Sequence, residues 1–299
     1  MASAISGLVP VSGETRRRAQ THVITESLFT RVALIAITIL GLGSLVFLPL
    51  ALVFVEALRK GMAGYLATLA NAETWHAIRL SLFTALIVVP ANTVFGVSAA
   101  WLLAKHQFWG RRLLSTIIDL PFSVSPVISG LIFVLLFGAQ GVLGPWLADH
   151  DIKIIFALPG IVLATAFVTF PFVAREVLPA LQACGNDEEE AALTLGATGF
   201  TVFFRVTLPK IKWAVLYGVV LCTARALGEF GAVSVVSGHI RGETNTMPLQ
   251  VEILYNEYDF TSAFAVASLL TLVAVVTLGV KKYLEWNQER LRHDSYTDR

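Results

Sequence analysis

The chain has 299 residues, of which 56% are hydrophobic and only 14% are charged, and its formal net charge is +1. This composition is that of a membrane protein with several spans and excludes an ordinary soluble domain. The small net charge argues against general binding to nucleic acid. The only two cysteines, Cys184 and Cys222, have neither metal-like nor redox spacing, so they predict no disulfide framework.

Six apolar runs each approach the ~20 residues that a bilayer core requires. We predict transmembrane helices over residues 32–58, 80–103, 113–137, 155–178, 213–236 and 261–280. The predicted fold class is therefore an all-α integral membrane protein with six transmembrane helices in a domain over residues 32–282. Residues 1–31 and 283–299 form terminal tails. Several prolines fall inside or near the runs, and membrane helices tolerate them where neighbours satisfy the freed carbonyls.

Lysine and arginine residues set the orientation of the predicted spans. Most of the 22 lie in tails and loops on the same side as the N-terminus, including the run Arg16, Arg17 and Arg18. The positive-inside rule then predicts that both termini lie in the cytoplasm, together with the loop over residues 181–212.

That loop between the fourth and fifth spans is the most informative stretch of the chain. Asp187 is predicted to cap a helix, with Glu190 completing a capping box. Glu188 and Glu189 join Glu190 in the first turn, where the helix dipole favours negative charge. Gly196 follows where the helix needs a residue tolerant of positive φ. The pattern predicts a charged helical elbow, which is either a docking surface or only a connection between two spans.

A second short helix is expected to complete the elbow. Phe200, Phe203 and Phe204 give it an apolar face at helical spacing, and Pro209 is expected to close it.

The order Glu190-Ala191-Ala192, Gly196, and then Val206-Thr207-Leu208-Pro209 resembles the EAA loop of ABC importer permeases, with valine where isoleucine is commoner. The resemblance implies the type I permease fold and a cytoplasmic ABC ATPase dimer that docks on the loop. It also implies that ATP and Mg²⁺ are bound by that ATPase and that this chain binds no cofactor. The coupling residues implied are Glu188, Glu189, Glu190, Ala191, Ala192, Gly196, Leu208 and Pro209.

Arg225 and Glu229 form the candidate substrate pathway, because charges inside a span are costly, roughly 2.5 to 3.5 kcal/mol for a central arginine. One helical turn separates them on one face. They are either an internal ion pair that stabilises the bundle, or a positive group in an anion pathway held by its carboxylate. Ser123 and Ser125 could also offer hydroxyl donors to an oxyanion, although a structural role for these serines is favoured.

Two further predictions concern charged residues near the ends of spans. Arg175 and Glu176 are expected to close the fourth span at the cytoplasmic face. Arg241 and Glu243 belong to a polar loop over residues 237–250, which is either part of an outer gate or an ordinary surface loop.

The segment Arg225–Ala232 is similar to sulfate and molybdate ABC permeases as a group. Its continuation through Val233–Gly238 and Ile240–Thr244 resembles W-type permease subunits of bacterial sulfate/thiosulfate importers. This resemblance covers about residues 30–285. It implies location in the bacterial plasma (inner) membrane, sulfate or thiosulfate as substrate, a homologous T-type permease partner, and a periplasmic or lipid-anchored sulfate-binding protein. A permease for molybdate or a related oxyanion is the alternative.

Function classes other than transport find little support in the sequence. There is no Walker-type Gly-x4-Gly-Lys-Ser/Thr pattern, no His-Glu-x-x-His pattern and no catalytic cluster. We therefore predict no catalytic residue and no metal site. An intramembrane enzyme and a scaffold subunit without a pathway are the alternatives from other classes.

Overall fold

The computed structural model describes residues 28–297, so Arg16, Arg17 and Arg18 of the predicted N-terminal tail lie outside the described residues. The chain divides into two compact units, residues 1–49 and 50–299. The described part of the first unit belongs to α1 (Leu28–Ala57), an apolar helix with Pro49 inside it. This helix matches the predicted first span.

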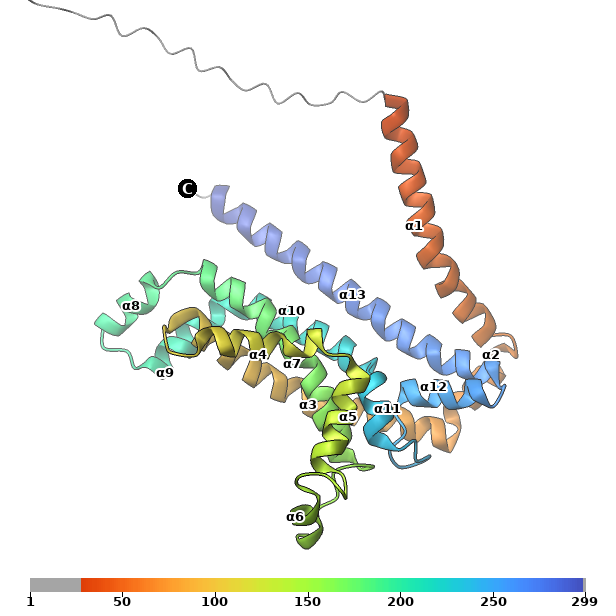
Figure 1. Cartoon of the computed structure of the whole chain (residues 1–299). Coiled ribbons are helices and arrows are strands. Elements are labelled where there is room, and N and C mark those ends of the chain that lie inside the picture. The colour runs from red at the N-terminus through yellow and green to blue at the C-terminus, as the bar shows by residue number, and fades with distance from the viewer. Residues whose placement is uncertain (1–27, 298–299) are drawn as a thin grey trace, which may run out of the picture. The chain divides into compact units, whose positions relative to one another are not determined.

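The second unit begins with the last residues of α1, and all its further regular elements among the described residues are helices joined by loops. In chain order they are α2 (Gly61–Ala70), α3 (Ala72–Lys105), α4 (Arg111–Ser123), α5 (Pro126–Phe137), α6 (Gly144–Asp149), α7 (Leu158–Ala183), α8 (Asp187–Thr194), α9 (Gly199–Val202), the π-helical turn η1 (Phe203–Thr207), α10 (Leu208–Leu227), α11 (Gly231–Ser237), α12 (Met247–Asn256) and α13 (Phe260–Thr297). Helices α8 and α9 lie at one end of this unit and α12 at the other (Figure 1).

The predicted all-α membrane architecture is confirmed. Within residues 28–297, five helices are long and apolar enough to cross a membrane: α1, α3, α7, the continuous stretch over residues 199–227, and α13. A sixth span exists if the bent pair α4 and α5 is counted as one. Helices α2, α6 and α12, which the sequence analysis had not separated from the loops, connect these spans.

The predicted third span is broken instead of straight. Helices α4 and α5 meet at an angle of 110°. Ser125, between them, has an extended backbone with ψ of 136°. It precedes Pro126, and the proline ring disfavours the helical conformation for the residue before it.

The predicted fifth span was placed too far toward the C-terminus. Pro209 does not close a helix but lies in the first turn of α10, where its missing N–H group costs nothing. The helix then stops at Leu227, and Gly228 and Gly231 flank the break before α11. Glycine is a poor helix former because its backbone loses more freedom on folding than that of any other residue.

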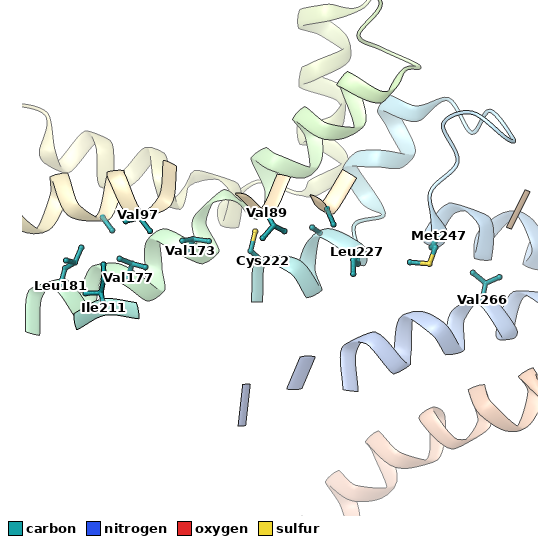
Figure 2. Close-up of a cluster of buried hydrophobic side chains, with 13 residues drawn as sticks. Val89, Val97, Val173, Val177, Leu181, Ile211, Cys222, Leu227, Met247 and Val266 are labelled. Atoms are coloured by element: carbon teal, nitrogen blue, oxygen red, sulfur yellow. The ribbon is translucent and has the colours of Figure 1, made fainter. Parts of the chain in front are cut away.

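Helices α3, α7 and α10 form the core of the second unit. Figure 2 shows the side chains that meet between them, among them Val97 of α3, Val173 of α7 and Cys222 of α10. The Asn92 amide adds a polar clamp by donating to the Thr169 hydroxyl (2.8 Å) and the Ala166 carbonyl (3.0 Å). Buried polar clamps of this kind hold membrane helices together because lipid offers no alternative partner.

Candidate functional site

Helix α8 is a charged helix that lies on the surface of the second unit. None of its residues is buried, and its apolar Leu193 is 51% exposed. The following Leu195 is 89% exposed. Helix α8 therefore presents two apolar side chains beside four acidic residues at the surface of the second unit.

The predicted capping box at the start of α8 is wrong. Asn186 is the N-cap residue, Asp187 is already helical, and no side chain caps the helix. The reason is that Lys105 Nζ donates to Asn186 Oδ1 at 2.8 Å and to the Gly185 carbonyl at 2.6 Å. The ammonium group of α3 therefore occupies the side chain that would otherwise cap α8.

Glu189 ties α8 to two other elements. Its Oε2 lies 3.1 Å from Lys105 Nζ at the end of α3, and its Oε1 accepts a hydrogen bond of 2.7 Å from Thr207 Oγ1 in η1. Only 7% of the Lys105 side chain and 16% of the Glu189 side chain are exposed. Since the pair is largely shielded from water, it is a firmer attachment than an ordinary surface salt bridge.

Glu188 and Glu190 behave differently from Glu189. Glu188 pairs with Lys210 of α10 at 2.7 Å, but 67% of its side chain is exposed. Glu190 is exposed and has no ion pair with any residue whose side chain the structure describes. It borders a groove of about 220 Å³ that also contacts Trp101, Leu193 and Phe203. Glu190 is thus available to a partner.

The predicted glycine turn after α8 is confirmed, because Gly196 has φ of +86°. The Ala191 and Ala192 carbonyls accept the Leu195 and Ala197 N–H groups, which closes the helix. Of the two remaining coupling residues, Leu208 is half-buried against the core and Pro209 is exposed.

Arg225 and Glu229 lie at the break between α10 and α11. Arg225 is in the last turn of α10, and its Nη1 lies 2.5 Å from Glu229 Oε2. The Glu229 side chain is 1% exposed, and its Oε1 accepts the Ala232 N–H at 2.9 Å. The carboxylate therefore joins the end of α10 to the start of α11. The Arg225 side chain keeps 32% of its surface exposed and can meet another molecule.

The structure brings the two helix breaks together. A methyl group placed on Gly231 would lie 2.9 Å from Pro126 Cβ, so the start of α11 packs directly on the start of α5. Ser123 ends α4 and Ser125 is the N-cap of α5, and both are exposed. The break that follows Arg225 and holds Glu229 thus packs, through Gly231, on the bend that holds Ser125.

Arg175 does not close the fourth span as predicted, because α7 continues for two more turns to Ala183. Its Nε lies 2.8 Å from Asp119 Oδ1 of α4, and its guanidinium stacks 4.7 Å above the Phe122 ring. The arginine links α7 to the broken third span.

The predicted outer loop is partly buried. Arg241 is exposed and pairs with Glu257 and, at 3.8 Å, with Glu73 of α3. The hydrogen bond that the Arg241 guanidinium donates to the Glu257 carboxylate raises the pKa of Arg241 above its ordinary value. The described contacts do not join Arg241 to Glu243, which is exposed. Further along, the Met247 N–H donates to Ser81 Oγ at 2.8 Å and anchors the loop on α3.

Helix α3 separates α8 from the outer loop. Glu73 in its first turn meets Arg241, whereas Lys105 in its last turn meets Glu189. A helix of 34 residues is about 50 Å long, which exceeds the ~30 Å thickness of a bilayer core. The two surfaces therefore lie at opposite ends of a spanning helix.

Sequence reasoning missed the residues that tether α8. No spacing of nearby residues marks Lys105 or Lys210 as a contact of α8, and Thr207 is distinguished only as part of the sequence Val206-Thr207-Leu208-Pro209. Lys105 is the last residue of an apolar helix, on the side of the membrane where the loop over residues 181–212 is expected. This position is the one feature of the sequence that points to a contact with α8. Its partners lie 80 or more residues away along the chain.

Residues 92–288 match the family model described as binding-protein-dependent transport system inner membrane component. The chain is 51% identical over 260 residues to the sulfate transport system permease protein CysW of Escherichia coli (strain K12), which covers 84% of this chain and 89% of that protein. It is 37% identical over 234 residues to CysT, another sulfate transport system permease protein of the same strain, with 78% and 84% covered.

A solved structure has the same fold. It is a chain of a bacterial alginate ABC transporter in complex with an alginate pentasaccharide-bound periplasmic protein. The TM-score is 0.70 at 17% sequence identity, and the match covers 88% of this chain and 95% of that chain.

Proposed function

This chain belongs to the family of binding-protein-dependent transport system inner membrane components, and from that premise we propose that it is the W-type permease subunit of an ATP-driven importer of sulfate and thiosulfate. The observation that carries the proposal is the 51% identity to the sulfate permease CysW over 84% of the chain. The lower identity of 37% to CysT supports the W-type over the T-type subunit.

Coupling to ATP hydrolysis would act through α8. A cytoplasmic ABC ATPase, present as a dimer, would cover the exposed leucines of α8 and contact Glu190 beside its groove. Because Glu189 is bound to both Lys105 and Thr207, a displacement of α8 would reach α3 and α10 together. Rigid helices would carry this motion through the bundle. The pathway would then open in turn to one side of the membrane and to the other. The chain itself would bind no nucleotide and would catalyse no reaction.

The substrate pathway would run past the junction of the two broken helices. Discontinuous membrane helices commonly form substrate sites, since the N-terminal ends of half-helices favour anionic groups. Here the start of α5, with Ser125 as its N-cap, lies beside the break that holds Arg225. A sulfate dianion would meet the exposed part of the Arg225 guanidinium, while Glu229 keeps that group in position.

The remaining partners follow from the same proposal. A homologous T-type permease would complete the pathway, and a periplasmic or lipid-anchored sulfate-binding protein would deliver the substrate. We place the complex in the bacterial inner membrane with α8 and both termini in the cytoplasm. The loop that holds Arg241 and Glu243 would then face the binding protein as part of an outer gate.

The test is ATP-driven uptake by the purified complex. The tagged full chain is purified from its host with its associated subunits and placed in liposomes. ATP is supplied on the side that the ATPase subunits face, and labelled sulfate, thiosulfate or molybdate on the opposite side. We expect an ABC ATPase and a second permease to copurify, and sulfate uptake to depend on ATP. Preferential uptake of molybdate, or copurification of a sugar-binding or polyamine-binding protein, would overturn the substrate assignment.

Glu190→Lys serves as the matched variant in this assay, with Asp187→Lys as its control on the same helix. Both carry the same change of charge in an exposed first turn, but only Glu190 borders the groove. We expect Glu190→Lys to abolish uptake at normal membrane insertion and Asp187→Lys to retain most of it. Equal activity of the two variants would contradict the docking role of the groove.

A further inference from the structure

Two adjoining cavities lie beside the end of α3 that carries Lys105. One is a polar cavity of about 570 Å³ and the other an apolar cavity of about 290 Å³. They share four lining residues, which are Leu103, Ser115, Leu178 and Gln182. The two cavities therefore form one continuous recess, of a size that suits a small-molecule ligand.

The polar cavity is positively charged. Its lining includes Arg111 and Arg112 at the start of α4 and no acidic residue. Gln107 Oε1 accepts a hydrogen bond of 2.8 Å from Arg111 Nη1 and orients that guanidinium. Trp109, in the same lining, is 97% exposed. An exposed tryptophan beside two arginines at the end of a spanning helix is typical of the headgroup level of a membrane.

The apolar cavity continues from there between α3, α4 and α7. Leu103, Ile118 and Ala174 form a buried cluster along its wall. The only charges in its lining are Asp119 and Arg175, and these pair with each other at 2.8 Å. The recess thus changes along its length from a cationic, polar end to a hydrocarbon end with no uncompensated charge.

We infer that this recess binds one anionic phospholipid of the surrounding bilayer. The headgroup phosphate lies at Arg111 and Arg112, and one acyl chain enters the cavity past Ser115 toward Ile118. Basic pockets between membrane helices recognise anionic headgroups through charge. The adjoining apolar space would hold an acyl chain, which a phospholipid has and a free phosphate does not. The inference depends on the proposed function only in requiring that the chain span a membrane.

The test measures lipid retention by the intact complex purified in mild detergent. Native mass spectrometry counts bound phosphatidylglycerol, and phosphatidylcholine and glycerol phosphate serve as zwitterionic and chain-free probes. Arg111→Gln/Arg112→Gln removes the charged end, with Arg31→Gln/Arg205→Gln as a control of equal charge change. Ser115→Trp fills the junction of the cavities, with Thr116→Trp as its control, because the neighbouring Thr116 is exposed and outside both linings.

We expect wild type to retain phosphatidylglycerol over phosphatidylcholine, and the double arginine variant to bind it at least about tenfold more weakly. Ser115→Trp should displace the lipid, whereas both controls should retain it. Equal retention by all variants would overturn the inference, as would equally tight binding of glycerol phosphate. A partner subunit seated in the recess would overturn it too, and would leave retention insensitive to Ser115→Trp. Sulfate uptake in the same preparation tests the proposed function separately.

Discussion

At Arg225, a stabilising role and a role in transport lead to different expectations for the pair with Glu229. Its pair with Glu229 compensates a charge that would be costly inside a span, roughly 2.5 to 3.5 kcal/mol on insertion scales. Glu229 is buried while Arg225 remains partly exposed, so the pair is one-sided. Under the proposed function, an anion would bind at the exposed part of the Arg225 guanidinium.

We predict that Arg225→Gln lowers sulfate uptake about 10- to 100-fold at normal assembly, because a charged hydrogen bond contributes roughly 1.5–3 kcal/mol. Arg225→Lys should retain part of the uptake since it keeps the charge. The measurement is initial uptake in vesicles normalised to the amount of assembled complex, with Arg59→Gln as an exposed control. Loss of the folded protein in Arg225→Gln would instead support a purely structural ion pair.

Lys105 is a second residue whose environment argues for a role in transmission. It binds the Gly185 carbonyl, the Asn186 side chain and the Glu189 carboxylate, so it holds the start of α8 at three points. We predict that Lys105→Met lowers uptake by about tenfold or more while ATP hydrolysis by the complex falls much less, because α8 loses its link to α3.

Lys210→Met is the matched control for Lys105. It removes the pair with Glu188, whose side chain is largely exposed, and exposed pairs contribute only about 0–1 kcal/mol. We therefore expect it to change uptake by less than about fivefold, which is the range that such energies allow. Identical losses in the two variants would show that the shielding of the Lys105 contacts has no mechanical consequence.

At the scale of elements, the loop over residues 181–212 combines a rigid helix with a defined turn. Helix α8 is held by ion pairs, and the left-handed residue Gly196 follows its C-cap. No heavy atom lies near the position where a side chain on Gly196 would begin. The glycine is therefore required for its backbone conformation and not for space.

The backbone requirement at Gly196 predicts different effects for two substitutions. Left-handed conformation costs an L-residue roughly 1–2 kcal/mol, and asparagine tolerates it better than a β-branched residue. We expect Gly196→Val to abolish uptake at normal membrane level and Gly196→Asn to retain a substantial part of it. Uptake assays with immunodetection of the inserted chain provide the measurement. Similar activity in both variants would rule out a backbone requirement.

At the scale of the whole molecule, the length of α3 separates the surface of α8 from the loop that holds Arg241. Its first turn contacts Arg241 and its last turn contacts Glu189, with about 50 Å between them. In Figure 1 the short helices α8 and α12 mark these two ends of the second unit. A motor at one end and a binding protein at the other would thus act on the same helix.

Cysteine labelling tests this arrangement. After Cys184 and Cys222 are replaced by alanine, single cysteines are introduced by Asp187→Cys or Glu243→Cys, both at exposed positions. We predict that a membrane-impermeant thiol reagent labels Glu243→Cys in spheroplasts and Asp187→Cys only in inverted vesicles. Labelling of both sites from the same side would refute the orientation.

The sequence by itself determined the membrane class, the approximate positions of the spans and the motif of the coupling loop. These depend on composition and on the spacing of nearby residues, which hydrophobic burial and backbone geometry translate directly into helices. Gly196 is an example, since its positive φ follows from its place after a helix of eight residues.

Only the tertiary structure decided which distant groups meet. The bend at Ser125 and the break at Gly228 occur inside runs that are apolar enough to read as single spans. Their contact at Gly231 and Pro126 follows from packing that no local pattern encodes. Lys105 likewise takes the place of a predicted helix cap, because an ammonium group from a helix 80 residues earlier competes for Asn186. Long-range contacts of this kind are set by the way the helices fit together, and sequence spacing does not contain them.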